Sequence, residues 1–466
     1  MLNQQKIKIY LALINAGLAI LTLGLSYNYL LIKPVASVSI IIFLILCWFE
    51  LSNILFLART FILGLIGYFP MVIKIFLGEN ALFSGFEQST QGFKIVVLMY
   101  IATSFALLSN TIGIYLGSIK TKTLNDVHLK HSTSNLSKSY WQIGFYIAIP
   151  IVIITAYKLS RSFGETIFTA GYGTSELTET LSLGSTNAIG ITALYLMYIA
   201  GIKKIIPNWK MIFLPLAFYF IVFSQLMHGA RQDAMTPLFG ILVLYGVSSN
   251  RNIKLRTRWL PFFFLGYVLM EAWGLLRSTW DSTHLTFSFF IDVLPSMFSG
   301  EVVKLGTISP ISSTFSSMVW LIDSGTLGMA WGRSYFEFLL RTPPEFMFPT
   351  RPTDYSWIYQ DYGLITGGGF FELAEVYMNF GLFGALILPG LISFLLAKSY
   401  FFAMKSQSML SYFLLFSFLS VFLRGTWYQT FAFYRAFLVC ILFYLIIVFC
   451  KEFIFSKNKK HIHETL

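Results

Sequence analysis

The amino-acid sequence predicts an all-α polytopic membrane protein, with about 12 transmembrane helices and one long extracytoplasmic loop between helices 9 and 10. The first observation behind this fold class is composition: of 466 residues, 56% are hydrophobic and only 12% are charged. Soluble domains carry roughly 25% charged residues, so this chain has too little polar surface to cover a soluble fold. The other two observations are apolar runs of membrane-spanning length and an alternation of basic and less basic loops between them.

The expected spans follow one another along the chain, each close to the roughly 20 residues that cross a bilayer. They are residues 9–25, 36–57, 61–77, 95–116, 141–157, 188–202, 211–227, 234–247, 259–276, 376–397, 410–423 and 431–450. Lys6 and Lys8 precede the first run, but no small-residue cleavage site follows it. We therefore interpret this run as a span and not as a removed signal peptide.

Basic residues in the short loops predict the side of the membrane on which each loop lies. One alternating set holds Lys6 and Lys8, Arg59, the basic residues of 120–138, of 203–210, of 251–258 and of 398–405, and the tail from Lys451. Because cytoplasmic loops carry the excess of lysine and arginine, we expect both termini in the cytoplasm. The net charge of +12 then needs no nucleic-acid partner, since the basic residues form no continuous stripe.

This orientation divides the chain into four parts. We expect helices 1–9 in residues 1–276, a long periplasmic loop in 277–369, helices 10–12 in 370–450, and a basic cytoplasmic tail in 451–466. Long loops without a function are uncommon. The prolines of RTPPEFMFPTRP exclude regular helix there, whereas the glycines at 367–369 permit close approach of the backbone to a ligand or another helix.

Arginines recur on the side predicted to be outside, against the positive-inside bias. They are Arg231, Arg277, Arg333, Arg341, Arg351, Arg424 and Arg435. A guanidinium stays charged and grips phosphate oxygens through two parallel hydrogen bonds. The set therefore suits an anion anchored in the bilayer, such as a lipid pyrophosphate. The alternative for any single arginine is snorkelling to the interface or pairing with a nearby acid, as Asp233 could pair with Arg231.

Acids on the same side supply candidate proton acceptors. Glu372 and Glu375 are three residues apart, which places them on one face of the helix that begins the tenth span. A partly desolvated carboxylate there could take a proton from a sugar hydroxyl; the alternative is that both acids favour the positive end of the helix macrodipole. His228 and His284 are further candidate bases, although a lone histidine is more often a polar loop residue.

The sequence lacks the motifs of several common enzyme classes. The chain has no Walker-type glycine loop, HExxH, CxxC or GxSxG, and no Asp-x-Asp on an early outer loop. Cys47, Cys440 and Cys450 lie in apolar runs without paired spacing, so we interpret them as small apolar residues. We expect no metal and no cofactor, with arginine side chains supplying the charge stabilisation.

Three segments resemble a known family. The segment GARQDAMTPLFGILVLYG resembles the arginine-containing start of a span in Wzy-type O-antigen polymerases and the related O-antigen ligases. The segment LLRTPPEFMFPTRP is similar to the proline-rich end of their long periplasmic loop, and GGGFFELAEVYMNFGLFGALI to the glycine-rich entry, glutamate and NFG of the repeat-unit polymerases. The resemblance covers most of residues 210–440, and the first half is similar only in hydropathy.

The resemblance implies a glycosyltransferase of O-antigen, lipopolysaccharide or related polysaccharide biosynthesis in the bacterial inner membrane. Such a polymerase transfers a growing glycan from undecaprenyl pyrophosphate to another lipid-linked oligosaccharide repeat unit at the periplasmic face. By position, Arg231 would bind pyrophosphate, Glu375 matches the family acid before NFG, and Arg424 resembles a late outer arginine. Some relatives carry a histidine where this chain has glycines 367–369, which leaves the base open. Besides undecaprenyl-pyrophosphate-linked oligosaccharides and membrane lipids, a chain-length regulator is a candidate partner.

Two other functions fit parts of the sequence. A lipid-linked oligosaccharide flippase can also have about twelve spans, but transporters of that kind are built from repeats around a central cavity, and no repeat is evident here. A membrane acyltransferase would need a catalytic histidine paired with an acid, and neither His228 nor His284 has such a setting.

Overall fold

The computed structural model describes residues 2–24, 29–77, 92–123, 135–161, 183–227, 231–255, 330–341, 371–427 and 430–464, and the regular secondary structure in these ranges is helical. The first helices are α1 (Leu2–Gly24), α2 (Tyr29–Glu50), α3 (Ile54–Leu77), α4 (Gly92–Thr123) and α5 (Asn135–Arg161). Next come α8 (Leu183–Ile202), the short 3-10 helix η1 (Asn208–Ile212), α9 (Phe213–Met227) and α10 (Arg231–Ser248). The last are α15 (Arg333–Arg341), α17 (Glu372–Ser406), α18 (Met409–Leu419), α19 (Phe422–Trp427) and α20 (Phe431–Glu464).

The all-helical architecture predicted from the sequence is confirmed for the described residues. Every expected span overlaps one of these helices, except 259–276, which lies outside the described residues. Five of the described helices are long and apolar enough to cross a membrane, and four shorter apolar helices accompany them. The total of twelve spans, the division of the chain into four parts and the place of the long loop stay predictions.

Two expected spans join separate helices: 36–57 includes the turn between α2 and α3, and 410–423 includes the break between α18 and α19. Helix α2 ends at Glu50, whose carboxylate accepts a 2.7 Å hydrogen bond from the Nζ of Lys8 in α1. Helix α3 begins after Asn53, whose side-chain oxygen accepts from the backbone N–H of Leu55 at 3.0 Å and so satisfies a free donor of the first turn. A charged and an amide side chain thus separate two helices within one apolar run.

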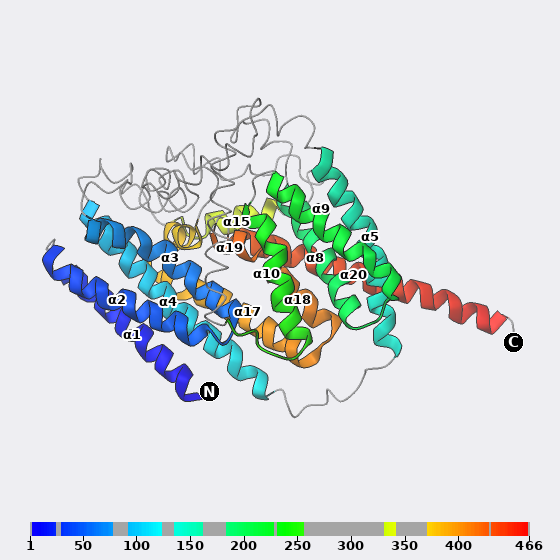
Figure 1. Cartoon of the computed structure of the whole chain (residues 1–466), viewed down its shortest axis with the longest axis horizontal. Helices are drawn as coiled ribbons and strands as arrows, with labels where there is room; N and C mark the ends of the chain where they lie inside the picture. The colour runs from blue at the N-terminus through cyan, green and yellow to red at the C-terminus, as the bar shows by residue number, and fades with distance from the viewer. Residues whose placement is uncertain are drawn as a thin grey trace, which may run out of the picture.

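The bundle is organised around α4, which packs against α1, α3 and α17. Close approach to α17 depends on Gly390, whose backbone N–H donates to the Ser109 hydroxyl of α4 at 2.8 Å. A Cβ on Gly390 would lie 2.4 Å from that hydroxyl oxygen, too close for any other residue. In Figure 1, α1 and α2 lie at one edge of the molecule, and the end of α20 extends from the opposite edge.

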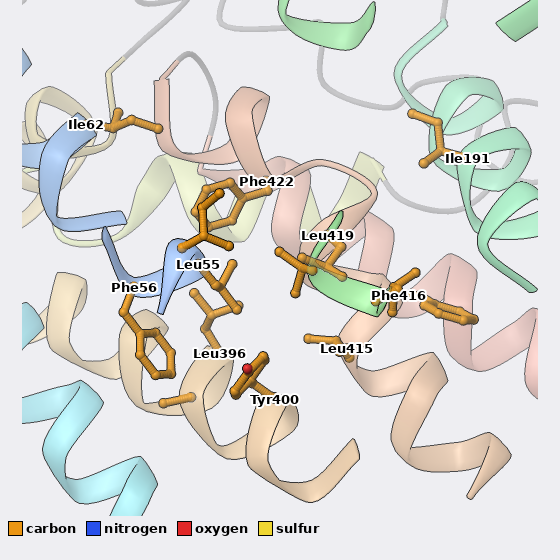
Figure 2. Packing of buried hydrophobic residues seen from close by; sticks show 14 of the residues in the cluster. Leu55, Phe56, Ile62, Ile191, Leu396, Tyr400, Leu415, Phe416, Leu419 and Phe422 are labelled. Atoms are coloured by element: carbon orange, nitrogen blue, oxygen red, sulfur yellow. The ribbon is translucent and has the colours of Figure 1, made fainter. Parts of the chain in front are cut away.

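A second group of helices completes the apolar core. Helix α8 packs against α5, α10 and α20, and α18 packs against α17 and α20. Figure 2 shows Leu55 of α3 beside Phe422 of α19, near Leu396 and Tyr400 of α17, all within one buried cluster. The short helix α19 is therefore held at the centre of the bundle, where its polar residues meet those of α3.

Helix α17 is broken at Gly381, and this break shapes the candidate site. The backbone of Gly381 has φ 60° and ψ −150°, a region that essentially only glycine adopts. We call residues 372–380 the short arm of α17 and residues 382–406 its long arm. In a straight helix Glu372 and Ser393 would be roughly 30 Å apart, yet both contact Arg59. The short arm therefore folds back beside the long arm.

The turn before α15 is docked on the end of the short arm. The backbone N–H groups of Ala330 and Trp331 donate to the carbonyls of Met378 and Asn379 at 3.1 and 3.0 Å. Carbonyls in the last turn of a helix lack partners within it, so this turn satisfies two of them. Helix α15 is thereby held against α17 and α20.

Candidate functional site

The centre of the site is an ion pair between Arg59 of α3 and Glu372 of the short arm. The two terminal nitrogens of Arg59 donate to the two carboxylate oxygens of Glu372. Both side chains are 0% exposed. This bidentate geometry is the strongest that arginine makes with a carboxylate, so it joins α3 firmly to the start of α17.

Two more donors of Arg59 reach α19 and the long arm of α17. Its Nη1 donates to the hydroxyl of Thr426 in α19 at 3.0 Å, and its Nε donates to the hydroxyl of Ser393 in the long arm at 3.3 Å. Ser393 in turn donates to Asn110 of α4 at 2.6 Å. One guanidinium therefore ties together α3, α19 and both arms of α17, as full satisfaction of a buried charge requires.

Glu375 lies one turn after Glu372 and is also wholly buried. Its Oε1 accepts a 3.0 Å hydrogen bond from the hydroxyl of Ser334 in α15. The side-chain nitrogen of Asn379 donates to the same hydroxyl at 2.7 Å and to the Glu375 backbone carbonyl at 2.8 Å. Ser334 thus connects α15 to two residues on one face of the short arm.

The second oxygen of Glu375 has a different environment. Thr430, just before α20, faces this carboxylate with its hydroxyl and backbone N–H. Nevertheless, neither Glu375 Oε2 nor Thr430 Oγ1 has a hydrogen-bond partner among the described residues. Within the described residues, Glu375 makes no ion pair of the kind that holds Glu372.

Aromatic rings enclose the Glu375 side of the site. The ring of Tyr335 in α15 stacks on Phe380 of the short arm, with centroids 6.2 Å apart. Tyr335 also meets the ring of Tyr434 in α20 edge to face at 5.9 Å. These contacts place α15 between the short arm and the start of α20.

The structure places the other predicted site residues as follows. Arg231 begins α10 and Arg341 ends α15, but their side chains are not among those described. Arg424 in α19 and Arg435 in α20 are partly buried, and each has an interaction partner. Arg277, His284 and Arg351 lie outside the described residues. Of the predicted set, Glu372 and Glu375 are brought together at the site, and Arg424 lies two residues from Thr426.

Two expectations differ from the structure. Arg59 was expected in a cytoplasmic loop, but it lies within α3 and is completely buried. The two acids were expected to be partly desolvated at a helix mouth, but both are 0% exposed, with Glu372 against Arg59 of α3 and Glu375 against Ser334 of α15. The sequence signal for Arg59 was its position inside a continuous apolar run, where an ionisable residue is usually paired and functional.

Ser334, Tyr335 and Thr430 are the site residues that the sequence did not indicate. None belongs to a charged or repeated motif, and Ser334 lies 41 positions from the Glu375 it contacts. Asn379 belongs to the NFG element quoted above, but sequence alone assigned it no role. Only the packing of α15 against α17 and α20 in the folded chain brings these residues to Glu375.

Comparison with known proteins identifies one family. The family model for O-antigen polysaccharide polymerase Wzy matches residues 6–315. The match includes the first half of the chain, where only the hydropathy had looked similar, and it contains Arg59 and Arg231. It ends before Glu372, Glu375 and Arg424, so it does not bear on their roles. Neither the curated proteins nor the solved structures contain a match to this chain.

Proposed function

The chain belongs to the O-antigen polysaccharide polymerase family, and on this premise we propose that Glu375 is the general base of a repeat-unit polymerase. In this proposal the donor is a glycan on undecaprenyl pyrophosphate, and the acceptor is another lipid-linked oligosaccharide repeat unit. The reaction takes place at the periplasmic face of the inner membrane, with both termini of the chain in the cytoplasm. A chain-length regulator remains a proposed partner.

The observation that carries the proposal is the asymmetric setting of the Glu375 carboxylate. Ser334 holds one oxygen at 3.0 Å, while the other oxygen faces Thr430 without a hydrogen bond of normal geometry to any described residue. A general base needs both properties: a fixed orientation and a free lone pair within reach of the proton it takes. Glu372 is engaged by Arg59 through both oxygens and is therefore better suited to positioning than to proton transfer.

The chemistry requires little bond activation because pyrophosphate is a good leaving group. The acceptor hydroxyl oxygen forms a bond to the anomeric carbon of the donor, and Glu375 takes the hydroxyl proton. The bond between the anomeric carbon and the pyrophosphate oxygen breaks, and the electron pair leaves with undecaprenyl pyrophosphate. Correct placement of the two reactants supplies much of the acceleration.

Charge develops on the departing pyrophosphate, and we assign its stabilisation to arginine. Arg231, which lies within the segment matched by the family, and Arg424 are the proposed primary contacts. Further proposed contacts are Arg277, Arg341, Arg351 and Arg435, with Glu372 and His284 on the sugar side. Guanidinium groups form two parallel hydrogen bonds with phosphate oxygens, so this chemistry proceeds in the proposal without a metal.

The test uses purified full-length protein and a lipid-linked repeat unit. Glu375→Gln keeps the size of the side chain but cannot accept a proton, so we expect turnover to fall by about 10²–10⁴ while the lipid-linked unit still binds. Glu337→Gln is the matched control, because Glu337 is a partly exposed acid of α15 that pairs only with Arg333 at 2.7 Å among the described residues. Near-normal turnover by Glu375→Gln would overturn the base assignment.

A deletion strain separates polymerase from flippase function. Loss of a polymerase leaves a single repeat unit on each lipid core. Loss of a flippase leaves no repeat unit on the periplasmic side at all. The second result would contradict the proposed reaction, whatever Glu375 does.

A further inference from the structure

Four polar side-chain atoms around the short arm are buried without a hydrogen-bond partner among the described residues. They are Glu375 Oε2, Asn379 Oδ1, Tyr335 Oη and Thr430 Oγ1. Each such atom loses its hydration on folding and gains no bond in return. Native proteins contain few of them, so a group of four in one place calls for an explanation, and a bound ligand supplies one.

The contacts of their neighbours bring the four atoms to one place. Glu375 and Asn379 are one helical turn apart on the same face of the short arm, and Ser334 bridges them. Tyr335 follows Ser334 directly and packs between Phe380 and Tyr434. Thr430 faces Glu375 from the chain just before α20. The group therefore lies where α15, the short arm and the start of α20 meet.

The Tyr335 hydroxyl is a hydrogen-bond donor in this place. Burial raises the pKa of Tyr335 well above its usual value, and the negative charge of Glu375 adds a smaller effect in the same direction. The hydroxyl therefore keeps its proton throughout the physiological range. The Thr430 hydroxyl can likewise donate, whereas Glu375 Oε2 and Asn379 Oδ1 can only accept.

This combination of two acceptors and two hydroxyls matches the hydroxyl groups of a sugar. A sugar hydroxyl donates one hydrogen bond and accepts others. Two neighbouring hydroxyls on one ring can therefore donate to Glu375 and Asn379 while they accept from Tyr335 and Thr430. A phosphate would meet the Glu375 carboxylate with like charge, and an apolar lipid chain would leave all four atoms unpaired.

We propose that these four atoms bind two neighbouring hydroxyl groups of one sugar ring, and that this ring is the acceptor in the transfer reaction. The inference rests on the proposed function, because the hydroxyl bound to Glu375 is the one that loses its proton. Asn379, Tyr335 and Thr430 then select the acceptor by the position of the second hydroxyl. A site that bonds a hydroxyl rejects analogues lacking it, since its own polar groups would be left unpaired.

Two nearly isosteric substitutions test the site, namely Tyr335→Phe and Thr430→Val. Tyr335→Phe removes a hydroxyl that has no hydrogen-bond partner among the described residues, so without substrate this variant should be as stable as wild type or more stable. Thr430→Val removes a hydroxyl that faces the Glu375 carboxylate, so its thermal midpoint is measured beside its KM. The probe is the single repeat unit on undecaprenyl pyrophosphate, extracted from a strain that lacks this chain. We expect each variant to raise KM about five- to tenfold, the value of one hydrogen bond, with kcat close to wild type. Thr430→Ser keeps the hydroxyl and should keep the wild-type KM.

Tyr68→Phe in α3 is the matched control. Its hydroxyl accepts from Asn15 at 2.6 Å and bonds to Ser104 at 3.0 Å, so its loss should lower thermal stability without changing KM. Unchanged KM in both Tyr335→Phe and Thr430→Val would overturn the sugar site and leave buried water as the occupant. If Glu375→Gln is inactive in that case, the proposed function stands and only this inference fails. If Glu375→Gln is fully active, the proposed function fails as well.

Discussion

Arg59 and Glu372, 313 positions apart in the chain, form an ion pair in which both side chains are completely buried. Such pairs are weak contributors to stability, because apolar residues of similar volume are often as good or better. Their attested use is to specify one arrangement of the chain. We expect the pair to specify the folded-back position of the short arm, which carries Glu375 one turn further on.

The first prediction separates positioning from stability. Arg59→Met alone leaves Glu372 buried and unpaired and should cost about 3–5 kcal/mol. In the double variant Arg59→Met/Glu372→Met neither charge remains, so the thermal midpoint should return close to wild type. If the pair positions Glu375, polymer formation should stay low in the double variant despite normal protein level. Recovery of both stability and activity would show that the ion pair is not needed to position Glu375.

A second prediction concerns the break in α17. Gly381→Ala places a side chain at φ 60° and ψ −150°, which costs on the order of 1–3 kcal/mol and favours a straighter helix. We expect a lower thermal midpoint and sharply reduced polymer length. Gly17→Ala is the control, since a Cβ there meets nothing within 4 Å and alanine is the better helix former. Normal activity of Gly381→Ala would show that the fold-back does not depend on this glycine.

Arg231, the first residue of α10, carries the third prediction. If its guanidinium holds pyrophosphate through two hydrogen bonds, Arg231→Lys keeps the charge but loses this geometry. Polymer on gels should then fall strongly while the amount of protein in the membrane stays the same. Polymer of wild-type length would instead indicate that Arg231 only extends to the membrane interface.

The fourth prediction tests the orientation. Cysteines introduced at Ser278 and Thr353 should react with a membrane-impermeant thiol reagent in intact spheroplasts. A cysteine at Arg251, an exposed residue after α10, should react only after lysis. The native Cys47 and Cys440 are buried, whereas Cys450 is partly exposed, so the labelling is done in a Cys450→Ser background. The reverse labelling pattern would place the proposed site on the cytoplasmic side.

Much of the architecture could be predicted because it depends on local composition. An apolar run near 20 residues must form a helix in lipid, where every backbone group needs an internal partner. For that reason each expected span within the described residues overlaps a helix, although three of these spans contain a break. The turn between α2 and α3 was missed because a single charged residue and an asparagine interrupt the apolar run only briefly.

The amino-acid sequence by itself determined the membrane class, the helices and the family, together with Glu372 and Glu375 as neighbouring acids. The resemblance singled out Glu375 as the candidate base, but the residues themselves gave no physical reason for preferring it to Glu372, since both lie on one helix face. The tertiary structure decided this difference: Arg59 reaches Glu372 from α3, whereas Ser334 and Thr430 surround Glu375. These partners come from distant segments that meet in the folded bundle, where the short arm reverses direction at Gly381. The surrounding groups decide whether a buried carboxylate is stabilised in its charged form. Which groups surround it is determined only by the folded bundle.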